Sequence, residues 1–460
     1  MGAAPAEPGP AEPLPDGRGT DAREPAGRQS GLDGAPDRAF LVAASLAGMA
    51  AIAAACLVLH VLALNGTYGK LTDALFITPF WSDASLVHAG FVPYHDFGLE
   101  YPPLSLPVFV LPAILPGGGL DYPSYRTMFE VLMALCAVGL VPITAWTIAR
   151  LGGRRVDVLL GIGFLAVTPL LLGPLTLSRY DLWPALLTAA ATLAMVSSRP
   201  RLAFALLALG ALAKVYPVFL APIFAWYAWR TAGRREAVIA LAIGAAIGIA
   251  GLAPFLAIDP SGAIGPFIRS VARPLQIESL GASILVVLHG WLGLHVGPVT
   301  YAFDSYNLVG PYTDELSSIE SGVLLGGLIV VTLGAAMGAA QPDRFVLAVA
   351  AALALTVAFG KVLSPQYAVW LVAAVAACAS LAARPLLGIG VVLVLTQVYF
   401  PARYERYLAG DLSPAIIVLE RNLVLAAVAI YLVAATWMRI RPPARPPRPD
   451  PPVDPAPAAA

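Results

Sequence analysis

The sequence predicts an all-α polytopic membrane protein, and both its composition and its pattern of apolar segments support that class. Of the 460 residues, 58% are hydrophobic and only 12% are charged. A soluble globular domain carries about 25% charged residues. A bilayer core about 30 Å thick needs about 20 apolar residues per helix, and segments near this length recur along the chain. We therefore predict a bundle of about 12 transmembrane helices, with interfacial helices in a long first outer loop.

The predicted spans follow from the distribution of apolar residues between charged or Pro-rich breaks. Residues 104–116 are also apolar, but this segment is short and interrupted by prolines, so we expect an interfacial helix there. Residues 72–89 are expected to form an amphipathic helix capped by Thr72 or Asp73. The spans are predicted at residues 40–64, 126–149, 156–174, 182–197, 201–213, 216–230, 237–257, 322–340, 345–360, 366–381, 384–400 and 415–438.

Charge indicates the orientation of the bundle. Residues 1–38 and 441–460 are rich in Pro and polar residues, so we expect two disordered tails around a membrane domain at 39–440. If residues 104–116 do not cross, the positive-inside rule places both tails in the cytoplasm and the loops 65–125 and 258–321 outside. The protein is then a multi-pass protein of the cytoplasmic membrane. The Arg-rich turns that fall on the tail side are Arg150–Arg155, Arg199–Arg201, Arg230–Arg235, Arg344 and Arg384.

Several classes of partner and cofactor lack support in the sequence. The net charge is zero, so nothing favours a nucleic-acid partner. The three cysteines lie far apart in apolar segments, and we expect them to be small buried side chains. The first outer loop lacks an Asp-x-Asp pair, and the chain lacks a Gly-rich nucleotide-binding loop. We therefore expect no metal site and no cofactor.

The predicted outer face carries most of the chemically informative residues. Cations at membrane depth are costly unless they have a role, and an anionic lipid phosphate would supply one. Snorkelling of single Lys and Arg side chains at helix ends is the alternative. The compact motifs are Ser178-Arg179-Tyr180-Asp181, Lys214-Val215-Tyr216-Pro217, Lys361 with Ser364-Pro365-Gln366-Tyr367, and Arg403-Tyr404-Glu405-Arg406-Tyr407.

The order of these motifs resembles the GT-C superfamily of polyprenyl-phosphate-sugar-dependent glycosyltransferases. Within it, the sequence is most similar to glycosyltransferase family 87, the actinobacterial mannosyltransferase-like group. The resemblance covers roughly residues 40–440. It is carried by Asp73, Gly90 with Pro93-Tyr94, Glu100-Tyr101-Pro102-Pro103-Leu104, Arg179-Tyr180-Asp181 with Trp183-Pro184, Lys214-Val215-Tyr216-Pro217, and Lys361 with Ser364-Pro365-Gln366-Tyr367.

The resemblance implies inverting transfer of a sugar, mannose first among the candidates, from a polyprenyl phosphate to a glycolipid or lipoglycan. The donor and the acceptor would bind at the outer face of the membrane, in contact with membrane lipids. The reaction would belong to the synthesis of cell-envelope glycolipids. The resemblance implies that Asp73 is the catalytic base, with Asp83 as the fallback. The leaving phosphate gains negative charge, so cations must stabilise it, and Arg179, Lys214 and Lys361 are the candidates. Sugar or acceptor contacts are expected from Glu100, Tyr101, Asp181, Tyr216, Gln366 and Tyr367.

Other functions remain open at this point. A twelve-helix transporter or a flippase of lipid-linked sugars would also be polytopic, but a carrier concentrates its polar groups near the midplane. A non-catalytic polyprenyl-lipid-binding scaffold would keep the basic residues and tolerate the loss of Asp73. The tyrosines could equally anchor the helices at the membrane interface. The aromatic segment after residue 296 is either an acceptor site or an ordinary loop surface.

Overall fold

Helices form most of the described chain, which comprises residues 2, 31–66, 77–337 and 339–438 of the computed structural model. Six described helices are long and apolar enough to cross a membrane, judged by length and composition. They are α1 (Arg38–Leu64), α5 (Tyr122–Arg150), α6 (Arg155–Leu172), α11 (Arg234–Ile258), α14 (Thr313–Ala336) and α19 (Leu412–Met438).

The other predicted spans correspond to shorter helices, two of which begin with a 3-10 turn that contains a proline. Proline is well tolerated there because the first turn of a helix needs no N–H donor. These elements are α8 (Leu182–Val196), α9 (Pro200–Ala213), η3 (Tyr216–Leu220) with α10 (Ala221–Ala232), α15 (Pro342–Ala358), η4 (Pro365–Tyr367) with α16 (Ala368–Ala377), and α17 (Arg384–Tyr399).

The remaining elements are short connectors. The predicted interfacial segment at 104–116 forms η2 (Pro103–Ser105) and α4 (Leu106–Ile114). The predicted amphipathic helix appears as α3 (Thr78–His88), while Thr72 and Asp73 lie outside the described residues. The others are α7 (Leu175–Ser178), α12 (Pro260–Ala272), α13 (Leu280–Leu292), α18 (Tyr404–Leu408) and an antiparallel hairpin of β1 (Val299–Ala302) and β2 (Ser305–Leu308).

Two short helices form the centre of the bundle. Every residue of α15 from Arg344 to Ala358 is buried. The neighbouring α16 packs against α5, α6, α8, α15 and α17. Gly161 allows the close approach of α6, because a Cβ at this position would lie 2.9 Å from the carbonyl oxygen of Ala376. The apolar surface of these central helices is therefore covered by other helices, which explains how such short apolar segments are accommodated.

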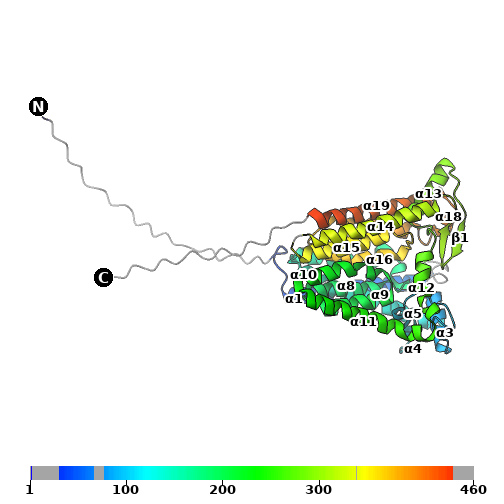
Figure 1. The fold of residues 1–460 in the computed structure, drawn as a ribbon, viewed down its shortest axis with the longest axis horizontal. Coiled ribbons are helices and arrows are strands. Elements are labelled where there is room, and N and C mark those ends of the chain that lie inside the picture. Colours follow the sequence, from blue (N-terminus) through cyan, green and yellow to red (C-terminus); the bar gives the residue numbers. More distant parts are fainter. Residues whose placement is uncertain (1, 3–30, 67–76, 338, 439–460) are drawn as a thin grey trace.

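The two ends of the bundle differ in character. Figure 1 shows α1 beginning and α19 ending at one end, whereas β1, α3 and α12 lie at the other. At the first end, residues that the sequence assigns to the N-terminal tail lie against the start of α6. The amides of Arg155 and Val156 donate to the carbonyls of Gly34 and Leu32, and Arg154 pairs with Asp33 at 3.0 Å.

The predicted all-α class is confirmed, and each predicted span coincides with a described helix. The boundaries differ where local chemistry intervenes. The span predicted at 322–340 begins earlier, at Thr313, where Asp314 and Glu315 occupy the first turn. Acidic residues there interact favourably with the helix dipole. The span predicted at 366–381 ends as an α-helix at Ala377, before a series of turns.

Candidate active site

A polar cavity of about 350 Å³ opens at the end of the bundle that carries the β-hairpin and α3. Its walls come from the loop before η2, the α7–α8 and α9–η3 turns, the segment 273–278, the hairpin, η4 and the start of α18. The motifs of the predicted outer face therefore meet in one place. The lining residues are Pro79, Ser82, Asp83, Gly98, Glu100, Tyr101, Arg179, Lys214, Arg273, Gln276, Glu278, Tyr301, Asp304, Ser305, Tyr306, Ser364, Pro365, Gln366, Tyr367, Phe400 and Tyr404.

Lys214 contributes a buried positive charge to the cavity wall. Its Nζ donates to Asp181 Oδ1 at 2.6 Å, and the indole Nε1 of Trp370 donates to the same oxygen at 2.7 Å. The ammonium also lies 4.8–5.5 Å from the ring centres of four aromatic side chains. Such cation–π contacts stabilise a desolvated cation. The four rings belong to Tyr101, Tyr180, Tyr367 and Trp370.

Two arginines add positive charge to the same cavity. Arg179 follows α7 in an extended conformation, directly before the turn that carries Asp181. Arg273 extends from the end of α12 and forms an ion pair with Glu100, and it also donates to the carbonyl of Phe303 at 2.8 Å. Three cations from distant parts of the chain thus surround one cavity. This arrangement suits an anion with several oxygens, such as a phosphate.

Asp83 places a carboxyl group in the cavity from α3. Burial, followed by the negative charges of Glu100 and Asp304, raises its pKa to about 7. A carboxyl group with a pKa near neutral pH suits general acid–base catalysis, because it both accepts and releases a proton readily. Asp83 is therefore a candidate for the base, and it is the fallback that the sequence resemblance implies. Asp73, the base implied by the sequence resemblance, lies outside the described residues.

The segment 276–278 forms a polar wall of the cavity, and Glu278 contributes a carboxylate to it. Glu278 lines the cavity and is almost fully buried, at 1% exposed. Burial raises its pKa to about 7, although Arg421 and a hydrogen bond from Tyr399 act in the opposite direction. Gln276 donates from Nε2 to Glu278 Oε2 at 3.3 Å and to Ser364 Oγ at 3.2 Å. This wall therefore connects the 258–321 loop to the Ser-Pro-Gln-Tyr motif.

Several predicted site residues meet in this cavity, and others do not. Glu100, Tyr101, Arg179, Lys214, Gln366 and Tyr367 line it. Asp181 lies directly behind it, hydrogen-bonded to Lys214. Tyr216 lies deeper, stacked on Trp370 with the ring centres 4.1 Å apart, so it supports the wall without lining it.

Lys361 is the predicted phosphate ligand that the structure places elsewhere. Its Nζ donates to the carbonyl of Val271 at 2.7 Å, in the last turn of α12, and it does not line the cavity. A cation at a helix C-terminus interacts favourably with the free carbonyls there. Arg273 is the third cation of the cavity instead. No sequence motif indicated this role, because Arg273 lies in the long loop 258–321.

The 258–321 loop also supplies residues that the sequence left between two interpretations. Tyr301, Asp304, Ser305 and Tyr306 of the hairpin line the cavity, as does Tyr404 of the Arg-Tyr-Glu-Arg-Tyr motif. Gln276 and Glu278 belong to none of the sequence motifs. Among the described residues, no group of three or more His, Cys, Asp and Glu side chains could hold a metal ion.

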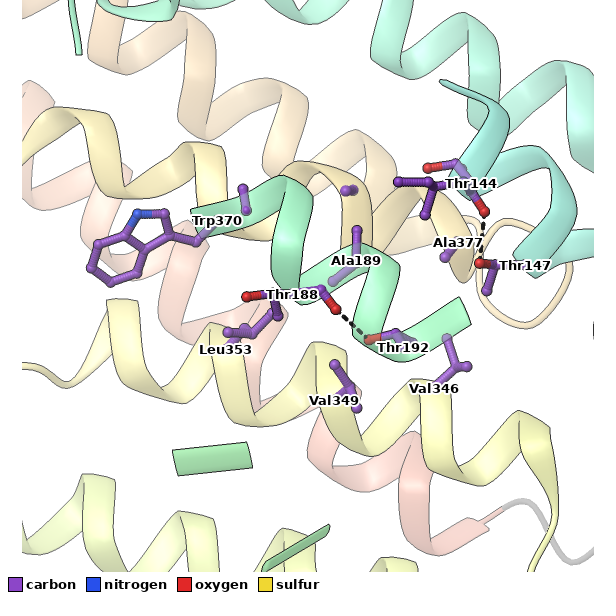
Figure 2. Close-up of a pocket in the computed structure, with 14 residues that line it drawn as sticks. Thr144, Thr147, Thr188, Ala189, Thr192, Val346, Val349, Leu353, Trp370 and Ala377 are labelled. Atoms are coloured by element: carbon purple, nitrogen blue, oxygen red, sulfur yellow. Dashed lines mark hydrogen bonds between the residues drawn. The ribbon is translucent and has the colours of Figure 1, made fainter. Parts of the chain in front are cut away.

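A second cavity inside the bundle is unsuitable for a substrate. It measures about 20 Å³ and lies between α5, α8, α15 and α16. Figure 2 shows Thr188 and Thr192 of α8 beside Val349 of α15, and Thr147 of α5 beside Ala377. Thr192 donates to the carbonyl of Thr188 at 3.0 Å. A volume of this size holds about one water molecule. Another cavity, of about 240 Å³ beside α1 and α5, is lined mostly by apolar side chains. The candidate site is therefore the polar cavity at the end of the bundle.

Comparisons with known proteins give weak similarities only. No protein-family model and no curated protein matches the sequence. Among solved structures, the apo form of the Archaeoglobus fulgidus oligosaccharyltransferase is similar at a TM-score of 0.42 and 13% identity, over 85% of this chain and 56% of that chain. The same enzyme tethered to an acceptor peptide with the NVT sequon gives 0.31 and 14%, over 75% and 48%. The chain thus spans about half the length of that enzyme.

Proposed function

We propose that the protein is a membrane glycosyltransferase of the GT-C type that uses a polyprenyl-phosphate sugar as donor. The observation that carries the proposal is the cavity at one end of an apolar bundle, where Arg179, Lys214 and Arg273 converge with Asp83. A cavity that gathers three cations at the end of a bundle suits a substrate whose phosphate lies at the headgroup level and whose tail lies in the bilayer. The donor is itself the substrate, and the proposal includes no cofactor.

The reaction is a single displacement at the anomeric carbon of the donor. An acceptor hydroxyl gives its proton to a carboxylate, and its oxygen forms a bond to the anomeric carbon. The bond between that carbon and the phosphate oxygen breaks, and polyprenyl phosphate leaves as a monoester with one more negative charge. Arg179, Lys214 and Arg273 stabilise this charge, because preorganised cations interact most strongly with charge that develops during the reaction.

Asp83 is the base that we propose among the described residues. It lines the cavity, and its pKa of about 7 leaves a substantial fraction of the carboxylate available at neutral pH. Asp73 stays the base implied by the resemblance to glycosyltransferase family 87. The two assignments differ in the variant that loses activity, so one experiment distinguishes them.

The finer assignments follow the sequence resemblance. Mannose is the proposed sugar, with Tyr101, Gln366 and Tyr367 as its contacts, and a glycolipid or lipoglycan is the proposed acceptor. The cavity end is proposed to face the outside of the cytoplasmic membrane, with both termini in the cytoplasm. The arginine-rich turns at the opposite end support this orientation under the positive-inside rule.

The position of the cavity argues against the alternative function of a transporter or flippase. A carrier forms its binding site near the midplane of the membrane, between two repeated halves. Here the large polar cavity among the described residues opens at one end of the bundle, whereas a cavity of about 240 Å³ beside α1 and α5 is lined mostly by apolar side chains. The cavity inside the bundle measures only about 20 Å³. An enzyme that works at one membrane face accounts for this distribution.

A transfer assay tests the proposal. Purified protein in lipid is incubated with radiolabelled polyprenyl-phosphate-mannose and a membrane-lipid extract, and thin-layer chromatography follows the label. We compare the wild type with Asp83→Asn, Asp73→Asn and the control Glu405→Gln, which removes an exposed carboxylate of α18.

Each outcome of this assay has a defined meaning. Transfer by the wild type and Glu405→Gln, with loss in Asp83→Asn alone, supports Asp83 as the base. Loss in Asp73→Asn alone keeps the enzyme class and moves the base to Asp73. No transfer by the wild type from mannose, arabinose or glucose donors, with several acceptors, contradicts the proposed function.

A further inference from the structure

The wall formed by Gln276 and Glu278 has features of a ligand subsite that the sequence motifs do not include. Both side chains line the cavity, and they are only 3% and 1% exposed. They lie in the 258–321 loop, which lacks regular structure at this point, yet the segment is tightly fixed. The amide of Gln276 donates to the carbonyl of Lys361 at 2.9 Å, and the amide of Ile277 donates to that of Tyr306 at 3.0 Å.

Buried groups on three helices hold the main chain and side chain of Glu278. Its carbonyl accepts hydrogen bonds from Arg421 Nη2 at 2.8 Å and from Asn422 Nδ2 at 3.1 Å. Its carboxylate accepts one from the hydroxyl of Tyr399, and that hydroxyl accepts one from Arg421 Nη1 at 2.8 Å. Tyr407 donates to the carbonyl of Ile277 at 2.5 Å. Such a connected network fixes the position of a carboxylate in the cavity before any ligand arrives.

The same wall offers hydrogen-bond acceptors that no described group uses. Gln276 Oε1 and Gln366 Oε1 are buried without a hydrogen-bond partner among the described residues, and both residues line the cavity. A buried acceptor without a partner costs free energy, so native proteins rarely retain one unless a water or ligand satisfies it. Together with the Glu278 carboxylate, these amide oxygens form a surface of hydrogen-bond acceptors that the hydroxyl groups of a ligand can satisfy.

The charges around the cavity narrow the class of ligand. Four lining residues are acidic, so a sugar that carries a carboxylate would meet repulsion from several sides. The three lining cations suit a phosphate instead, and Arg179 lies close enough to Glu278 for its charge to act on that carboxylate. A sugar attached to a phosphate at Arg179 would therefore reach the Gln276–Glu278 wall. The acidic residues are Asp83, Glu100, Glu278 and Asp304.

We propose that Gln276 and Glu278 form a subsite that recognises the hydroxyl groups of a neutral, unmodified sugar on the lipid donor. Arg421, Asn422 and Tyr399 act as positioning residues, because they hold Glu278 without lining the cavity themselves. The inference rests on the proposed function and deepens it, since it assigns the sugar-specific part of donor binding to a wall that the sequence motifs do not include.

The test compares the binding of a donor with and without its sugar. Full-length protein in nanodiscs is titrated with decaprenyl-phosphate-mannose and with decaprenyl phosphate, each by displacement of radiolabelled decaprenyl phosphate. The ratio of the two dissociation constants isolates the contribution of the sugar. A hydrogen bond to a charged group corresponds to about a ten- to hundredfold change in affinity.

We expect the wild type to bind the mannose-loaded lipid about ten- to hundredfold more tightly. Glu278→Gln and Gln276→Ala should bring this ratio close to one and leave the binding of decaprenyl phosphate unchanged. The matched control Glu405→Gln should keep the wild-type ratio. Retained binding of the sugar-free lipid shows that each variant has folded.

Two results would overturn the inference while the proposed function stands. One is a wild-type ratio of one. The other is a wild-type ratio that persists in Gln276→Ala and in Glu278→Gln. If Glu278→Gln binds neither lipid because its network is lost, Gln276→Ala decides between these results. A wild type that binds neither lipid would contradict the proposed function itself, and the inference with it.

Discussion

The ion pair of Lys214 and Asp181 allows a quantitative prediction about stability. Lys214 Nζ lies 2.6 Å from Asp181 Oδ1, and both side chains are buried. Asp181 Oδ1 also accepts a hydrogen bond from Trp370. We consider Lys214→Met, which keeps an apolar chain of similar length but removes the charge. Asp181 then keeps its negative charge in the protein interior with one neutral hydrogen-bond donor.

The expected cost follows from this burial. Removing one partner of a buried ion pair destabilises a protein by about 3–5 kcal/mol, because the other charge stays buried without compensation. Loss of the contacts with four aromatic rings adds to this cost, since a desolvated cation–π contact contributes about 2 kcal/mol. Asp181→Asn should also destabilise, because it leaves the ammonium without its counter-charge. The double variant Lys214→Met/Asp181→Asn should lose less than the sum of the single variants.

A double-mutant cycle measures this coupling. The free energies of unfolding of all four proteins are measured by denaturant titration in mixed micelles, and the sum of the single effects is compared with the double effect. We expect a coupling of about 2–3 kcal/mol, at the upper end of values for residues in contact. Additive effects, or a loss below 1 kcal/mol for Lys214→Met, would refute the reasoning, because exposed pairs behave in that way.

Three further predictions concern other parts of the molecule. Because the pKa of Asp83 is raised to about 7, the folded protein binds a proton at this residue more strongly than the unfolded chain does. Stability should therefore fall as pH rises from about 4 to 7. Asp83→Asn should reduce this loss, and Glu278, whose pKa is also raised to about 7, should account for part of what remains, in unfolding measured at several pH values. Gly262→Ala places a Cβ 1.8 Å from the carbonyl oxygen of Tyr94, so thermal unfolding should show a loss of about 1–3 kcal/mol. Arg201→Ala removes a bidentate but exposed pair with Glu236, and the same measurement should show a change below about 1 kcal/mol.

The sequence predicted the helices well, because apolar length is a local property. The shortness of α16 and α17 did not mislead the prediction, since charged or Pro-rich residues mark their ends. Length and proline content separated η2 and α4 from the spans, because that apolar segment is short and prolines interrupt it at 103, 107 and 112. Capping within residues 67–76, including the role of Thr72 and Asp73, lies outside the described residues.

The motifs predicted part of the cavity, and tertiary structure determined the rest. Arg179 and Lys214 are adjacent to helix ends in the sequence, so their common level at one end of the bundle followed from the topology. Lys361 satisfied the same criterion but is held by the end of α12, a contact between residues far apart in the chain. Gln276 and Glu278 had no recognisable motif, because their place in the cavity depends on backbone pairing with Lys361 and Tyr306.

The most direct test of the central claim is a cryo-EM structure of the full-length protein with decaprenyl phosphate. The account predicts density for the phosphate in the cavity, within hydrogen-bonding distance of Arg179, Lys214 and Arg273, with the lipid tail leading into the bilayer. Phosphate density at another end or face of the bundle, with this cavity holding no lipid, would contradict the account.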